Sequence, residues 1–181
     1  MREKLLRRGT GIAMLALSVL AGPGITSARA GDVTKVPVTD IVTGEVLGSA
    51  RLLRTNSGLS VELVTGDLVS HDAYTMWWIL SNADGSFQLV TNASGGLAGS
   101  DGRGNFASHV SVGELPPVDG LLTLTAVGDS FDDPYGVSVM IVVRSHGPVI
   151  PGKQFEQTHW FPGGCPPNDC EDVQQAFFPG R

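Results

Sequence analysis

The sequence VSVMIVVRSHGPVIPGKQFEQ, Val137–Gln157, joins a strongly apolar run to the densest group of reactive side chains in the chain. Its first seven residues, Val137–Val143, carry no charge and are rich in β-branched side chains. That pattern is typical of a central strand that is buried on both faces. The sequence RSHGP, Arg144–Pro148, then ends the strand. The stretch predicts a sheet whose rim carries a cation, a hydroxyl and an imidazole, and functional groups are commonly found on such rims.

Outward from this stretch, short apolar runs alternate with turns rich in Gly, Asn and Asp, and helical periodicity is almost absent. The spacing predicts an all-β domain of about eight to nine strands, mostly antiparallel hairpins, in a β-sandwich or barrel. The expected strands are Val36–Val42, Gly48–Arg54, Leu59–Val64, Tyr74–Ser81, Phe87–Thr91, Asn105–Ser111, Leu121–Val127, Val137–Arg144 and Glu171–Phe178.

Alternation within the strands predicts which faces are buried. Leu59, Val61 and Leu63 share one face of their strand, so that face is expected to point into the core. In Tyr74–Ser81 both faces carry bulky side chains, so we expect this strand to pair with or face Val137–Val143 at the centre. The two tryptophans of this strand are expected to be core residues and not a carbohydrate platform.

The first thirty residues have the three parts of a secretory signal peptide: a basic start, an apolar run at Ile12–Ala21, and the small-x-small sequence Ala28–Ala30. Cleavage there leaves residues 31–181 as a single domain, which we expect to be secreted or periplasmic. The apolar run is shorter than the roughly 20 residues that a membrane-spanning helix needs, so no membrane span is expected.

The net charge of the chain narrows the classes of molecule that it is expected to bind. The whole chain has a formal net charge of −6, and its first thirty residues hold five cations and one anion, so residues 31–181 carry −10. An acidic domain of this kind is poorly suited to bind nucleic acid or anionic lipid. We therefore expect an extracytoplasmic ligand or protein as the partner.

Cys165 and Cys170 are the only cysteines in the chain. In an exported protein an even pair at this spacing predicts a disulfide bond, which would pin the Pro-rich tail so that Glu171–Phe178 can dock as the last strand. The alternative is a thiolate metal site, although the sequence has no second Cys pair or paired-His motif to complete one.

Two stretches carry a resemblance to known proteins. GSARLLRTNSGLSVELVTGDLVSHDAYTMWW, Gly48–Trp78, and VVRSHGPVIPGKQFEQ, Val142–Gln157, together with the late Cys pair, resemble a group of bacterial exported proteins. These are in turn distantly similar to the CHRD-type β-sandwich, which is named for its repeats in chordin. The resemblance implies a secreted antiparallel Greek-key β-sandwich and brings no catalytic residues.

A second motif, Gly128-Asp129-Ser130-Phe131, resembles the nucleophile block of GDSL-type esterases. Those enzymes need a later Asp-x-x-His block and a doubly wound α/β domain. Neither follows here, so we interpret the motif as a polar turn.

The histidines allow two interpretations. His109, His146 and His159 could bind copper or zinc if the fold brings them together. The Cys-His-Met loop of blue-copper proteins and the His-x-His pairs of copper-zinc dismutases are, however, absent. In the alternative, His146 hydrogen-bonds within its own turn and Arg144 pairs with Glu156 or another carboxylate. We favour this alternative, so no cofactor is expected.

These patterns predict an exported binding or structural module. The alternative is an enzyme, a copper- or zinc-dependent oxidoreductase or hydrolase centred on His146. A third interpretation is a carbohydrate or peptide ligand on an exposed aromatic surface that includes Tyr135, Trp160 and Phe161. The candidate binding residues are Arg144, His146, Glu156, His159 and Trp160.

Overall fold

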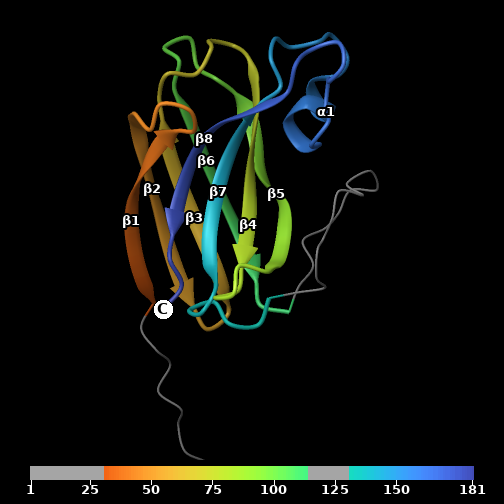
Figure 1. Ribbon diagram of the computed structural model, residues 1–181. Helices are drawn as coiled ribbons and strands as arrows, with labels where there is room; N and C mark the ends of the chain where they lie inside the picture. The colour runs from red at the N-terminus through yellow and green to blue at the C-terminus, as the bar shows by residue number, and fades with distance from the viewer. Residues whose placement is uncertain (1–30, 114–130) are drawn as a thin grey trace, which may run out of the picture.

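The computed structural model describes residues 31–113 and 131–181, whose regular structure consists of eight strands and one short helix (Figure 1). The strands are β1 (Asp32–Asp40), β2 (Val46–Thr55), β3 (Gly58–Thr65), β4 (Ala73–Ser81), β5 (Phe87–Leu97), β6 (Gly104–Ser111), β7 (Ser138–Ser145) and β8 (Glu171–Phe178), and the helix is α1 (Gln154–His159). All strand pairs are antiparallel, in the order β5-β4-β7-β8-β1-β2-β3-β6. The predicted all-β, antiparallel fold is therefore confirmed, whereas the helix is not predicted by the sequence.

The sheet curls until its two end strands, β5 and β6, come into contact, which gives the domain a barrel-like shape (Figure 1). One pairing in the middle of the sheet is very short. Thr39 pairs with Gln175 and Asp40 pairs with Gln174, and these are the only pairs between β1 and β8 in the described ranges. The sheet therefore divides into two four-stranded halves, β5-β4-β7-β8 and β1-β2-β3-β6, which meet along this seam.

Alternating side chains fill the space inside the curled sheet. The alternation predicts that Leu59, Val61 and Leu63 of β3 point into the core, and this is confirmed. One face of β4 joins them there, with Tyr74, Met76, Trp78 and Leu80. The predicted central pairing is also confirmed, because β4 pairs with β7 from Tyr74↔Ser145 to Ser81↔Ser138. β7 lies between β4 and β8, and Val139, Ile141 and Val143 point into the core.

Both tryptophans of β4 are buried, and only 3% of Trp77 and 1% of Trp78 is exposed. Trp78 belongs to the core cluster and donates a hydrogen bond from Nε1 to Ser108 Oγ at 3.0 Å. Trp77 lies on the outer face of β4, where Phe161 packs edge-on against it with ring centroids 5.3 Å apart. The prediction that these tryptophans are packed inside the protein is confirmed.

A buried arginine closes the end of the domain near the C-terminus. Arg54 is 1% exposed. Its Nη1 donates to the carbonyls of Pro134 at 2.6 Å and Val137 at 2.9 Å, and its Nη2 donates to the carbonyl of Pro179 at 3.1 Å. Burial lowers the pKa of Arg54 from its usual value, but the guanidinium keeps its charge. These bonds tie β2 to the segment before β7 and to the residues after β8.

β5 is longer than the sequence predicts. The strand runs to Leu97, whereas the sequence predicts that it ends at Thr91. The prediction stops there because the Asn-Ala-Ser-Gly-Gly sequence that follows is typical of a loop. Gly95 has a packing role in this extension, since a Cβ atom at this position would collide with the carbonyl oxygen of Thr158 in α1. The glycine allows the helix to lie directly against the face of the strand.

Three predictions fall outside the described residues: the leader at residues 1–30, the strand at Leu121–Val127, and the first three residues of the Gly128-Asp129-Ser130-Phe131 motif. Among the residues that are described, no helix has the length and apolar character needed to cross a bilayer.

Candidate functional site

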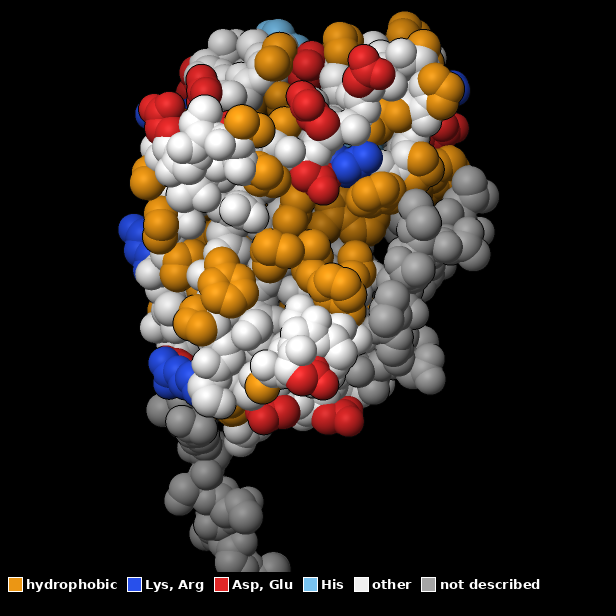
Figure 2. All heavy atoms as spheres, in the orientation of Figure 1, with side chains coloured by type: hydrophobic (Ala, Val, Ile, Leu, Met, Phe, Trp, Pro, Cys, Tyr) orange, Lys and Arg blue, Asp and Glu red, His pale blue; other side chains and the backbone are white. Residues whose placement is uncertain are grey.

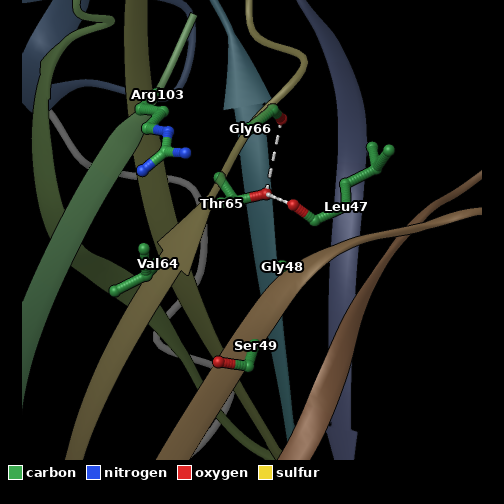
Figure 3. A pocket seen from close by; sticks show the side chains of 7 residues that line it. All are labelled: Leu47, Gly48, Ser49, Val64, Thr65, Gly66 and Arg103. Atoms are coloured by element: carbon green, nitrogen blue, oxygen red, sulfur yellow. Dashed lines mark hydrogen bonds between the residues drawn. The ribbon is translucent and has the colours of Figure 1, made fainter.

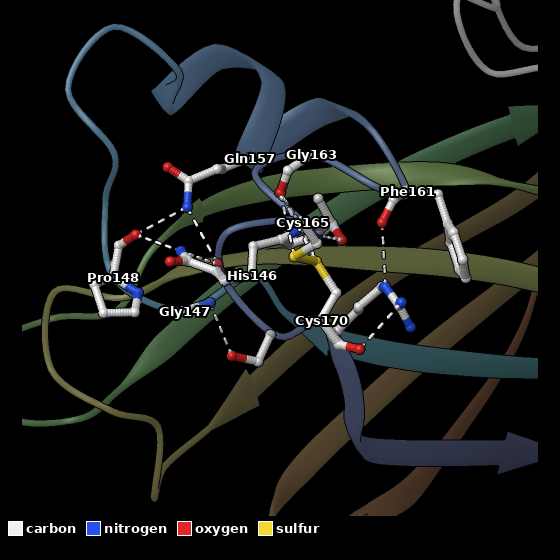
Figure 4. The surroundings of a disulfide bond; sticks show 12 residues. His146, Gly147, Pro148, Gln157, Phe161, Gly163, Cys165 and Cys170 are labelled. Carbon is white, nitrogen blue, oxygen red and sulfur yellow. Dashed lines mark hydrogen bonds between the residues drawn. A yellow bond between two sulfur atoms is a disulfide. The ribbon is translucent and has the colours of Figure 1, made fainter.

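The β7–β8 connection, residues 146–170, covers the end of the sheet that lies opposite the C-terminus, and it carries α1 (Figure 1). Two side-chain amides hold it in place. Gln157 Nε2 donates to the carbonyls of His146 at 3.2 Å and Pro148 at 3.0 Å (Figure 4). Asn168 Nδ2 donates to the same two carbonyls, each at 2.7 Å. The connection is therefore fixed by internal hydrogen bonds although little of it is regular structure.

His146 lies under this connection with none of its surface exposed. Its Nδ1 is 2.8 Å from the carbonyl oxygen of Gly163, which can only accept, so Nδ1 carries the proton. Nε2 then accepts from Thr75 Oγ1 at 2.8 Å, and that oxygen accepts from Trp77 Nε1 at 2.7 Å. Burial lowers the pKa of His146 more than its hydrogen bond to Gly163 raises it. The ring is therefore a neutral imidazole with one defined tautomer.

The predicted disulfide joins Cys165 and Cys170, whose Cα atoms are 5.9 Å apart. It lies directly beside the imidazole, with Cys170 Sγ 3.3 Å from His146 Nδ1 (Figure 4). Among the described residues, these three form the one group of His, Cys, Asp and Glu side chains able to surround a metal ion, and their ligand atoms lie within 4.8 Å of one another. In the disulfide-bonded protein both sulfur atoms are committed to each other.

Arg144 fastens the connection to the sheet. Its Nη1 donates to Asp172 Oδ1 at 2.6 Å, its Nε to the Phe161 carbonyl at 3.2 Å, and its Nη2 to the Cys170 carbonyl at 3.3 Å. The guanidinium also lies 3.9 Å from the centre of the Phe161 ring, where a cation–π contact is favourable. The carboxylate partner of Arg144 is thus Asp172 of β8 and not Glu156, and its other two donors bind carbonyls of the connection.

An aromatic surface, formed by Phe155, His159 and Trp160, lies on and just after α1. The Phe155 and His159 rings stack with centroids 4.1 Å apart and 16° between their planes, and Trp160 meets Phe155 edge-on at 6.4 Å. Phe155 remains 57% exposed. His159 Nδ1 lies 3.0 Å from the carbonyl oxygen of Phe155 and donates to it, so Nε2 is left as an acceptor at the surface. The helix thus presents rigid apolar rings beside a polar atom.

The structure divides the predicted site residues into three places. Arg144, on β7, and His146, in the β7–β8 connection, both serve to hold that connection in place. Glu156, His159 and Trp160 lie together on or next to α1. His109 is on β6, paired with Ser60 Oγ at 2.9 Å near the opposite end of the sheet. The three histidines proposed as metal ligands therefore do not converge.

The predicted aromatic surface of Tyr135, Trp160 and Phe161 is also divided. Phe161 is covered by Arg144 and Trp77. Tyr135 lies at the C-terminal end of the domain, where its carbonyl accepts from the Arg181 amide at 3.0 Å. Of these three residues, only Trp160 lies on the exposed side of α1, where its ring contacts Phe155 edge-on.

Two pockets elsewhere on the described surface have no converging reactive groups in their linings. One, of about 420 Å³, is lined by Leu47, Gly48, Ser49, Val64, Thr65, Gly66 and Arg103 (Figure 3). The Arg103 side chain is 72% exposed and pairs with Asp101 at 3.7 Å. A second, of about 370 Å³, is lined by Val36, Pro37, Thr39, Met140, Gln175 and Phe177. Hydrophobic side chains gather around the middle of that face (Figure 2).

Phe155 and Thr75 are the site residues that the sequence analysis did not single out. Phe155 and His159 are four residues apart, the spacing that brings side chains together on a helix, but so short a helix gives no clear periodicity. The alternation of side chains along a strand places Thr75 and Trp77 on the same face of β4. It does not show which part of the chain covers that face.

No protein-family model matches the chain, and no curated protein is significantly similar to it.

Proposed function

We propose that this protein is an exported binding module that recognises carbohydrate through the aromatic surface on α1. The observation that carries this proposal is the exposed Phe155–His159 stack. The C–H-rich face of a sugar ring packs favourably on flat aromatic rings, and sugar hydroxyls hydrogen-bond to nearby polar atoms. His159 Nε2 and the half-exposed Glu156 carboxylate lie on the same helix to receive such hydroxyls.

Rigidity supports the proposal. Asn92 Nδ2 of β5 donates to the His159 carbonyl at 2.5 Å, and Thr158 Oγ1 lies 2.9 Å from His159 Nδ1. Behind the helix, the amide of Gln157 and the Cys165–Cys170 disulfide hold the connection. A surface that is ordered before binding loses little conformational entropy when a ligand arrives.

The proposal extends to architecture and location. Two layers, β5-β4-β7-β8 and β1-β2-β3-β6, would form the Greek-key sandwich of a CHRD-like protein of bacterial origin. The signal peptide would deliver that domain to the secreted or periplasmic side. Its acidic charge supports a neutral ligand over an anionic polymer.

The metal-dependent enzyme centred on His146 is less well supported. Both ring nitrogens of His146 make hydrogen bonds and the ring is fully buried. A substrate therefore has no direct access to this imidazole in the disulfide-bonded protein.

The test compares Phe155→Ala with Phe87→Ala, because the two phenylalanines are 57% and 53% exposed and lie on different elements. Binding of the whole protein is screened on a glycan array and on insoluble polysaccharides, and hits are measured by calorimetry. An aromatic contact contributes about 0.5–1.5 kcal/mol, which corresponds to roughly 2- to 13-fold in affinity. Phe155→Ala should lose at least this much, and Phe87→Ala should bind like the unmodified protein.

Two results would contradict the proposal. One is unchanged glycan affinity in Phe155→Ala. The other is a complete absence of glycan binding by the folded, disulfide-bonded protein, which would make protein capture the next experiment.

A further inference from the structure

We propose that reduction of the Cys165–Cys170 disulfide converts this part of the β7–β8 connection into a zinc site, with both thiolates and His146 Nδ1 as ligands. The site is separate from the aromatic surface, so it stands or falls independently of carbohydrate binding. The proposal starts from the three potential ligand atoms, which already lie within 4.8 Å of one another.

The geometry requires only small movements. In a tetrahedral zinc site with Zn–S near 2.3 Å and Zn–N near 2.0 Å, neighbouring ligand atoms are roughly 3.5–3.8 Å apart. Cys170 Sγ and His146 Nδ1 are 3.3 Å apart in the disulfide-bonded protein. The two sulfur atoms need only separate from bonding distance to this spacing. A Cα–Cα separation of 5.9 Å leaves room for that change through side-chain rotation.

The chemistry balances with a dithiol as the reductant. The dithiol transfers two electrons and two protons to the disulfide, giving two cysteine thiols and the oxidised, disulfide form of the reductant. Zn²⁺ then displaces the two thiol protons to solvent, and the two thiolates neutralise its charge. Both cysteines are half-buried, so reductant and ion can approach them from the surface. The fourth ligand position stays open to solvent.

His146 already has the outer partner that a zinc ligand needs. Metal-bound imidazoles nearly always donate their second ring N–H to a nearby acceptor. When zinc takes Nδ1, the ring proton moves to Nε2, which lies 2.8 Å from Thr75 Oγ1. Thr75 Oγ1, which already accepts from Trp77 Nε1, then accepts from His146 Nε2 as well and turns its own proton away from the ring, which keeps its position. In exchange, the imidazole gives up its bond to the Gly163 carbonyl.

Soft thiolates and an imidazole favour zinc over hard ions such as Ca²⁺ and Mg²⁺. A redox-dependent site also explains why a fully buried imidazole lies directly beside a half-buried disulfide. If the imidazole only held Gly163 in place through its hydrogen bond, reduction of the disulfide would not create a zinc site.

The test titrates the whole protein with Zn²⁺ against a chromogenic chelator, before and after reduction by a phosphine, which contains no thiol to compete for metal. We expect one tightly bound zinc per chain after reduction and none before it. Co²⁺ as a spectroscopic substitute should show a thiolate-to-cobalt charge-transfer band and tetrahedral ligand-field bands. The Cys165→Ser/Cys170→Ser variant should bind in neither state.

His146→Gln and His109→Gln form a matched pair, since His109 lies on β6 away from the disulfide. The first should lose at least 100-fold in zinc affinity, and the second should behave like the unmodified protein. Should His146→Gln fail to fold, the cobalt spectrum of the unmodified protein still reports whether nitrogen completes the site.

Several results would overturn the proposal. These are no zinc in reduced, folded protein, equal zinc binding in the disulfide-bonded state or in the double-serine variant, and unchanged affinity in His146→Gln. A reduced protein that loses its β-sheet circular dichroism and does not regain it with zinc would also overturn it.

Discussion

Replacing Thr75 by Val tests the hydrogen-bonded chain beneath the β7–β8 connection. The two side chains have nearly the same shape, so the change removes mainly the hydroxyl. Thr75 Oγ1 accepts from Trp77 Nε1 at 2.7 Å and donates to His146 Nε2 at 2.8 Å, and all three residues are buried. Each polar group left unpaired costs about 1–3 kcal/mol. The free energy of unfolding should therefore fall by about 2–6 kcal/mol, a large share of the roughly 5–15 kcal/mol typical of a domain.

The assay is urea unfolding of the disulfide-bonded protein, followed by far-UV circular dichroism. With a slope of about 1–3 kcal/mol per molar urea, the midpoint should drop by about 0.7 M or more. Thr75→Ser keeps the hydroxyl and should lose only about 1 kcal/mol for the missing methyl group. Thr34→Val on β1, where no hydrogen bond of the side chain to another described residue is present, should change stability by about 0.5 kcal/mol or less. If Thr75→Val lost no more than Thr75→Ser, the hydrogen-bonded chain would not be holding the connection.

Two further predictions concern other parts of the fold. Arg54→Met should lower the free energy of unfolding by about 3 kcal/mol or more, because it removes the donor that three carbonyls share. Thermal unfolding measures this loss. A loss below about 1 kcal/mol would show that these carbonyls find other donors. Hydrogen bonds from the Thr43 backbone and side chain lower the pKa of Asp40, so its contribution to stability should be present at neutral pH and disappear as the pH falls below about 3.9. Asp40→Asn should therefore be less stable than the unmodified protein at pH 7, and the difference should close in acid; a constant difference across this range would contradict the assignment.

Alternation and turn chemistry were enough to predict the centre of this fold. Leu59, Val61 and Leu63 could be assigned to the core because one face of their strand is apolar and the other is not. The β4–β7 pairing followed from two apolar strands that each need cover on both faces. Such local patterns do not show which strands distant in sequence become neighbours. The strand order and the seam between β1 and β8 could therefore not be derived from them.

The candidate site was only partly predictable, for a related reason. The disulfide followed from the number and spacing of the cysteines. The contact between His146 and Cys170 did not, because it depends on how residues 146–170 fold back over β4. β5 was cut short in the prediction because Gly95 favours a loop locally, whereas in the protein it allows the Thr158 carbonyl to approach the strand.

The position of β8 in the sheet determines the order in which the fold can be completed. β8 comes from the C-terminal end of the described chain but lies between β7 and β1. Until residues 171–178 are delivered, the edge of β7 that pairs with β8 remains open, and such edges readily recruit other chains. A chain emerging from its N-terminus would therefore keep an open sheet until residues 171–178 had also emerged. Safe folding of an exported form would then depend on rapid completion of translocation or on a chaperone that shields β7.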